Sequence, residues 1–82
     1  MNQEGGIILK ISMSQLKPGE FAKVTDIDSP ITLRLEELGL TVGTVIECVL
    51  RSPLSDPTAY RIRGALIAIR GRDCENITVD RM

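Results

Sequence analysis

The sequence has 82 residues, the length of one small domain, and its 43% hydrophobic and 26% charged residues are typical of a folded chain rather than a disordered one. It contains no histidine, which excludes Ser-His-Asp and Cys-His catalytic relays and imidazole metal ligands. We therefore expect a binding or adaptor module that is not an enzyme, with no catalytic residues and no cofactor.

The formal net charge of −1 hides an uneven distribution of charge. Residues 51–72 contain five arginines and one aspartate, whereas residues 1–50 and the last ten residues are both net acidic. The arginines are Arg51, Arg61, Arg63, Arg70 and Arg72. They form either an ordinary solvated face or a patch that faces an acidic surface or a phosphate backbone.

Cysteine usage and hydropathy point to the cytoplasm. Cys48 and Cys74 lack CxxC spacing and cannot build a disulfide framework, so we expect reduced thiols. The amino-terminal residues lack a signal sequence, and the longest apolar run, residues 65–69, is far shorter than the ~20 residues of a membrane helix.

The first third of the chain is predicted to form a tail, a strand, a turn and a second strand. Residues 1–6 are polar and glycine-containing and are expected to form a flexible tail, with a single domain over residues 7–82. Branched apolar residues predict a first strand at 7–11 and, after a turn over 13–19, a second strand at 21–27.

One short helix is expected between Ser29 and Gly39. Ser29 suits the N-cap position and Pro30 the first helical position. Gly39 ends the helix, and Leu40 follows where a Schellman motif would place it against Leu35. The predicted apolar stripe consists of Ile31, Leu35 and Leu38.

The second half predicts more strands, over residues 45–51, 60–63, 65–70 and 77–80. The first of these is mostly apolar on both faces, which predicts burial on two sides. Tyr60 and Ile62 should point inward. Residues 52–57, with two prolines, are expected to form a loop, and residues 71–76 a turn.

Five or six short strands and one short helix predict a mainly β fold, a small closed or nearly closed barrel. The sequence has no glycine-rich phosphate loop and no carboxylate pair spaced for acid–base catalysis.

An ordered series of turn and packing signals runs through residues 12–80. It comprises Leu16-Lys17-Pro18-Gly19, Arg34 to Leu40 with Gly43 behind it, Ser52 to Pro57, Tyr60 to Gly64, Ala65 to Arg70, and Ile77-Thr78-Val79. In this order and spacing the sequence resembles the FeoA family, small cytosolic partners of the bacterial ferrous-iron transporter. The resemblance implies an SH3-like β-barrel that regulates or assembles Fe²⁺ uptake by contacting FeoB or another copy of itself.

Ten residues are candidates for partner binding. They are Leu33, Leu38, Gly39, Leu40, Pro53, Asp56, Pro57, Arg61, Arg63 and Arg70. Leu33 lies off the apolar stripe and is the best candidate for an exposed anchor. The helix-end residues could instead pack in the core, and the loop residues could serve only to form the turn. Arg70 could form an ion pair within the barrel.

Two other functions stay open. A nucleic-acid-binding SH3-like module would use the arginines of residues 51–72, although only Phe21 and Tyr60 could stack on bases. Direct binding of a transition metal ion such as iron or zinc would depend on scattered carboxylates and the two thiols.

Overall fold

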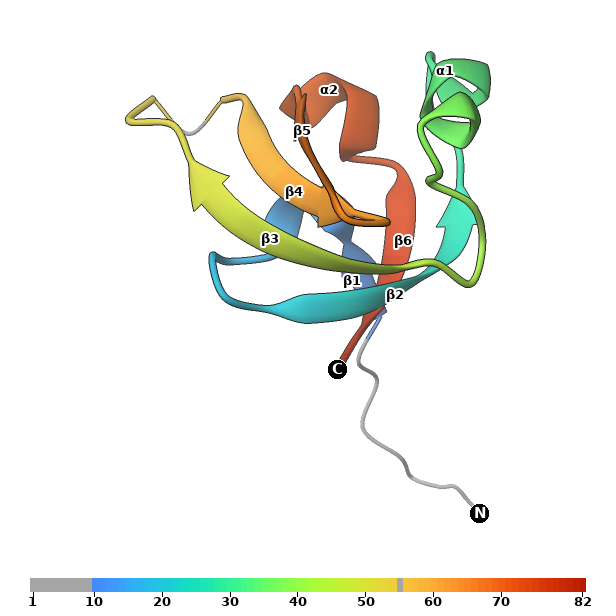
Figure 1. Cartoon of the computed structure of the whole chain (residues 1–82), viewed down its shortest axis with the longest axis horizontal. Coiled ribbons are helices and arrows are strands. Elements are labelled where there is room, and N and C mark those ends of the chain that lie inside the picture. Colours follow the sequence, from blue (N-terminus) through green and yellow to red (C-terminus); the bar gives the residue numbers. More distant parts are fainter. Residues whose placement is uncertain (1–9, 55) are drawn as a thin grey trace.

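The computed structural model describes residues 10–54 and 56–82, which form one strongly curved antiparallel sheet with short helices at one end (Figure 1). The strand order is β1-β6-β2-β3-β4-β5, so β1 and β5 are the two ends of the sheet. The strands are β1 (Lys10–Ser12), β2 (Phe21–Ile27), β3 (Val45–Arg51), β4 (Thr58–Ile62), β5 (Ala65–Ile69) and β6 (Ile77–Arg81). The expected mainly β architecture is confirmed. The predicted tail and residues 7–9 of the first predicted strand lie outside the described residues.

One face of the curved sheet fills the interior, because side chains alternate along each strand. The strands contribute Ala22, Val24, Ile46, Cys48, Tyr60, Ile62, Ile69, Ile77 and Val79 to the core. Met13, at the start of a 3₁₀ turn over Met13–Gln15, and Leu16 close one end of this core. Tyr60 and Ile62 point inward as predicted.

The prediction that the third strand is buried on both faces is wrong. Val45 is 47% exposed and Leu50 is also exposed, because no element of the described residues covers the outer face of β3. A register shift between Cys48 and Leu50 in the pairing of β3 with β4 also interrupts the alternation. The outer face of this strand is therefore an accessible apolar surface.

The helix α1 (Thr32–Glu37) begins later than predicted. Ser29 is not its N-cap; its hydroxyl instead accepts from the Ile31 backbone N–H and donates to the carbonyl of Asp73 in α2 (Gly71–Cys74). The predicted Schellman ending is confirmed, since the Gly39 N–H donates to the Glu36 carbonyl at 3.0 Å and the Leu40 N–H to the Leu35 carbonyl at 2.9 Å. The helix α2 itself replaces part of the predicted 71–76 turn and buries Cys74.

The polar atoms inside the core belong mainly to Tyr60 and the two thiols. The Tyr60 hydroxyl donates to the Met13 carbonyl at 3.3 Å and lies 3.7 Å from the Cys74 sulfur. Both cysteines are free and buried. Residues 10–54 and 56–82 hold no cluster of three or more acidic, cysteine or histidine side chains that could bind a metal ion, and no helix there is long and apolar enough to cross a membrane.

Stability should fall at alkaline pH. Burial raises the pKa of the Cys48 and Cys74 thiols and of the Tyr60 phenol in the folded protein. Because these groups ionise more readily in the unfolded chain, their contribution to the free energy of unfolding is complete below the pKa of the unfolded thiols. It is lost as the pH rises above that value. Urea unfolding at a series of pH values should show a declining free energy above about pH 9. A double variant, Cys48→Ala with Cys74→Ala, should show a shallower decline, and an equal slope in both proteins would contradict this account.

Candidate partner-binding site

A groove runs between α1 and β5, and we call it the α1–β5 groove. Its volume is about 260 Å³. It is lined by Ile31, Arg34, Leu35 and Leu38 from the α1 segment, by Ile67, Ala68, Ile69 and Arg70 from β5 and its end, and by Asp73 from α2. Successive side chains of a strand point to opposite faces, so four consecutive lining residues mean that β5 shows its edge to the groove. The groove is therefore bounded by a helix face and a sheet edge.

Two of the predicted partner-binding residues, Leu38 and Arg70, both line this groove. Leu38 was predicted to belong to the buried stripe, but it is 42% exposed because it is the C-cap, at the point where the chain turns away from the core. Arg70 is exposed, and Arg34 lines the groove from α1. Within residues 10–54 and 56–82 neither arginine makes a side-chain hydrogen bond or ion pair, so two unpaired guanidinium groups lie beside an apolar floor.

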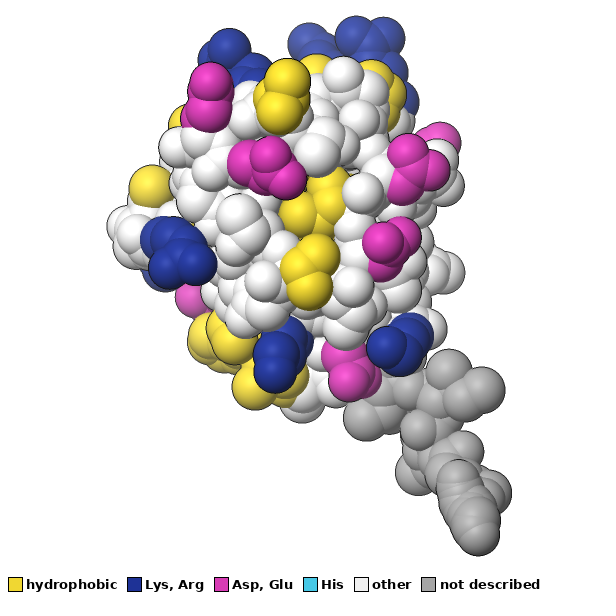
Figure 2. All heavy atoms as spheres, turned by 90° about the vertical axis from the view of Figure 1, so that its right-hand side faces the viewer, with side chains coloured by type: hydrophobic (Ala, Val, Ile, Leu, Met, Phe, Trp, Pro, Cys, Tyr) yellow, Lys and Arg dark blue, Asp and Glu magenta, His cyan; other side chains and the backbone are white. Residues whose placement is uncertain are grey.

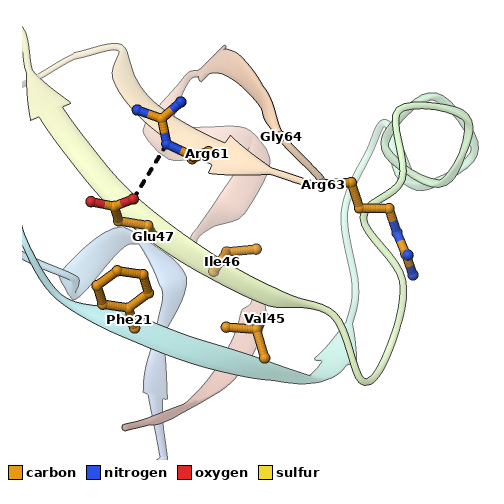
Figure 3. Close-up of a pocket in the computed structure, with 7 residues that line it drawn as sticks. All are labelled: Phe21, Val45, Ile46, Glu47, Arg61, Arg63 and Gly64. Carbon is orange, nitrogen blue, oxygen red and sulfur yellow. Dashed lines mark hydrogen bonds and ion pairs between the residues drawn. The ribbon is translucent and has the colours of Figure 1, made fainter.

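A second hollow lies on the outer face of the sheet, and we call it the sheet-face hollow. Its volume is about 210 Å³, and Phe21, Val45, Glu47 and Arg61 are among the residues that line it (Figure 3). The Arg61 Nε atom lies 3.3 Å from a carboxylate oxygen of Glu47, with which it forms an exposed ion pair. Of the charged residues that line this hollow, Arg61 and Glu47 are therefore already paired with each other.

The strand predicted over residues 60–63 would place Arg61 and Arg63 on one face, but β4 ends at Ile62 and Arg63 lies outside it. It occupies the turn between β4 and β5 with a φ of +48°, and Figure 3 shows its side chain pointing away from Arg61 toward the segment that follows α1. There its Nε donates to the Gly39 carbonyl at 2.9 Å. Two of the predicted partner-binding residues, Gly39 and Arg63, thus contact each other and join α1 to the turn that begins β5.

Arg51 forms hydrogen bonds within the fold and is not free to bind a partner. It is half-buried, and its guanidinium donates to the carbonyls of Ser14 at 2.8 Å and Leu16 at 2.6 Å. The arginines of residues 51–72 therefore do not form one continuous surface. The face that carries α1 also mixes hydrophobic with acidic side chains, and basic side chains lie toward its margins (Figure 2).

The other candidate residues separate by exposure. Leu33 is 78% exposed on α1, as predicted for an anchor. Leu40 is fully buried, so its candidacy as a contact is wrong, because it packs in the core as part of the Schellman ending. In the 52–57 loop, Pro53 is exposed and Pro57 half-buried. The exposed Asp56 accepts a hydrogen bond from the Gly71 N–H at 2.7 Å, which ties the loop to α2.

Sequence reasoning missed Arg34 and Ile67 as groove residues. Arg34 stood out only as part of the helix-end motif, and Ile67 only as one residue of an apolar strand. No local signal could find them, because their proximity depends on which strand ends the sheet. The one available signal was an apolar strand without charges or prolines next to a two-residue turn, which is the pattern of an unprotected end strand.

Replacing Gly39 should destabilise the protein more than replacing Gly43. Both have a strongly positive φ, +100° and +95°, which costs an L-residue about 1–2 kcal/mol. A Cβ at Gly39 would also lie 2.8 Å from the Cδ of Arg63, whereas nothing lies within 4 Å of one at Gly43. Urea unfolding of Gly39→Ala and Gly43→Ala should show the larger loss for Gly39→Ala, by a further ~0.5–1.5 kcal/mol for the broken Arg63 bond. Equal losses would mean that the hydrogen bond between Arg63 and Gly39 contributes nothing to the free energy of unfolding.

Replacing Arg51 should lower the free energy of unfolding, with Arg72 as the matched control. The Arg51→Met variant loses two charge-assisted hydrogen bonds to carbonyls, a loss of about 1.5–3 kcal/mol. Arg72 is exposed on α2, and Arg72→Met should change stability by less than ~0.5 kcal/mol. Chemical denaturation of the two variants compares them directly, and equal stabilities would refute a structural role for Arg51.

Comparisons with known proteins agree on one family. The sequence matches the FeoA domain over residues 11–81. The chain has no match among curated proteins. The solution structure of the FeoA protein from Chlorobium tepidum is 32% identical, with a TM-score of 0.82 over 88% of this chain and 70% of that one. The iron(II) transport protein A from Clostridium thermocellum is 28% identical, with a TM-score of 0.82 over 88% of this chain and 46% of that one.

A third structure, the zinc complex of FeoA from Stenotrophomonas maltophilia, is 24% identical, with a TM-score of 0.75 over 85% of this chain and 89% of that one. It is described as a prokaryotic SH3 domain protein, and its fold confirms the SH3-like architecture expected here. With a family match that covers nearly the whole of the described barrel, this chain belongs to the FeoA family.

Proposed function

We propose that this protein is an accessory protein of ferrous-iron uptake that acts by binding the cytosolic part of a FeoB-type transporter. Family membership supports the connection with iron transport. One structural observation supports the binding role, namely the α1–β5 groove with its apolar floor and two arginines that lack partners among the described residues. Under this proposal the protein regulates or assembles the transporter, and it works in the cytoplasm.

The groove has the composition of a protein-binding surface. Interface cores combine apolar side chains with arginine, and a few buried anchors supply most of the binding energy. Leu38 and Ile67 provide apolar surface here, and Leu33 stands exposed on the same helix. A partner that covers Leu38 and brings carboxylates to Arg34 and Arg70 would pair the charges of these two arginines. In the sheet-face hollow, by contrast, Arg61 and Glu47 are already paired with each other.

The nucleic-acid alternative has less support. It needs the arginines of residues 51–72 on one accessible surface, but Arg51 binds two carbonyls of its own chain and Arg63 binds Gly39. Arg61 is paired with Glu47. A phosphate backbone would have to compete for most of these groups, so we favour a protein partner.

A titration with the transporter's soluble GTP-binding domain tests the proposal. Leu38 and Val45 are similarly exposed, at 42% and 47%, but lie in different hollows. The wild-type protein should show localised NMR shift changes at the α1–β5 groove. Leu38→Glu should weaken binding at least about tenfold, equivalent to about 1.4 kcal/mol, because it places a carboxylate in the apolar contact.

Val45→Glu is the control and should bind as wild type. If neither the soluble domain nor the intact transporter binds the protein, the proposed function is wrong. If Val45→Glu alone abolishes binding, the partner uses the sheet-face hollow, and the site assignment is wrong.

A further inference from the structure

The end strand β5 has hydrogen-bonding groups that its own sheet does not use. β4 and β5 are joined by the two residues Arg63 and Gly64, and Ile62 pairs with Ala65 next to this turn. In a hairpin with a two-residue loop the pair next to the turn is hydrogen-bonded, and hydrogen-bonded pairs then alternate with non-bonded ones. The N–H and C=O groups of Leu66 and Ala68 therefore point away from β4.

These groups face the open edge of the sheet. Among the strands of the described residues, β5 is last in the sheet order and pairs with β4 alone. Over residues 10–54 and 56–82, no backbone or side-chain hydrogen bond reaches the N–H or C=O of Leu66 or Ala68. An extended chain laid along this edge could form up to four hydrogen bonds with the two residues.

The strand itself also lacks most of the features that normally protect an end strand from pairing, and α1 lies across the groove from it. Such strands are guarded by charged side chains, prolines, bulges or a covering helix. The five residues of β5, Ala65–Ile69, include no charge and no proline, and their pairing with β4 has no register shift. Leu66 is 58% exposed on this strand. In its described part, β1 at the other end of the sheet carries an exposed lysine, Lys10.

The space next to the edge can take a few side chains of a segment that lies along β5. The α1–β5 groove lies between this edge and α1, and its ~260 Å³ is below the usual ~300–1,000 Å³ of a small-molecule pocket. Ile67, Leu38 and Ile31 offer apolar contacts to side chains that point into it. Arg34 and Arg70 outnumber the single carboxylate, Asp73, so the groove favours a segment that carries acidic residues.

We propose that β5 binds an extended, acidic segment of a partner protein as a seventh strand of the sheet, in the manner of strand addition. Alternate apolar side chains of the segment enter the α1–β5 groove, and its carboxylates pair with Arg34 and Arg70. The inference deepens the proposed function, on which it rests for the identity of the partner. A second copy of this chain is a less suitable occupant, because its own α1 flanks its β5 and both helices would need the same space.

A designed peptide probes the edge directly. The probe is a blocked heptapeptide with valine at its second, fourth and sixth positions, threonine at its third and fifth, and glutamate at both ends. Titration into the ¹⁵N-labelled protein should shift the amide signals of Leu66 and Ala68 and slow their hydrogen exchange. A peptide with lysine in place of both glutamates should bind at least tenfold more weakly, and Arg34→Gln with Arg70→Gln should remove this preference.

The decisive variant is Ala68→Pro, which removes an outward N–H. Proline is tolerated where an edge strand's N–H faces solvent, so the variant should fold and bind the peptide at least tenfold more weakly. Ala68→Val keeps the N–H, so any weakening that it causes comes from the side chain and should be smaller than the weakening by Ala68→Pro. If Ala68→Pro does not fold, peptides methylated at one backbone nitrogen at a time test the same hydrogen bonds without changing the protein. Methylation of a nitrogen that faces β5 should weaken binding similarly, and methylation of the alternate nitrogens should not.

Three results would overturn the inference. These are the absence of shifts at millimolar peptide, shifts confined to the sheet-face hollow, and self-association through β5 that the Ala68→Pro variant abolishes. Transporter binding that Ala68→Pro leaves unchanged would also refute strand addition while the proposed function stands. Peptide binding at the edge without any transporter binding would refute the proposed function and leave the strand addition in place.

Discussion

The helix α1 has only six residues, too few to form a stable helix without tertiary contacts, so its position depends on how its carboxyl end is held. Leu35 and Leu40 enter the core on either side of Gly39, whose positive φ lets the chain reverse between them. The Gly39 carbonyl then accepts a hydrogen bond from the Nε of Arg63, which lies in the turn before β5. This join sets the separation of α1 from the sheet edge, and the α1–β5 groove is the space that results.

The same topology that builds a small barrel also leaves it an open edge. A sheet that closes fully satisfies every backbone group, whereas this one ends at β1 and β5. Next to β5 lie an exposed helix face and the guanidinium groups of Arg34 and Arg70, which have no partner within residues 10–54 and 56–82. A module of this size has little interior to spare for a pocket, so binding along an edge uses backbone groups that the fold already provides.

Much of the fold could be predicted from the sequence, because its signals are local. The Schellman ending follows from Gly39 and the leucines around it, and the inward direction of Tyr60 follows from alternation along a strand. The exposed outer face of β3 could not be predicted, since an apolar strand gives no sign of what covers it. Nor could the roles of Arg51 and Arg63, which depend on carbonyls 35 and 24 residues away in the sequence.

We infer that this FeoA-family protein binds its partner along the β5 edge and α1. Amide hydrogen exchange of the full chain, with and without the transporter's soluble GTP-binding domain, tests it residue by residue. The claim predicts that the amides of Leu66 and Ala68 exchange slowly only in the complex, together with those of α1. Unchanged exchange at both residues in a demonstrated complex, or protection confined to β2 and β3 around Phe21 and Val45, would contradict it.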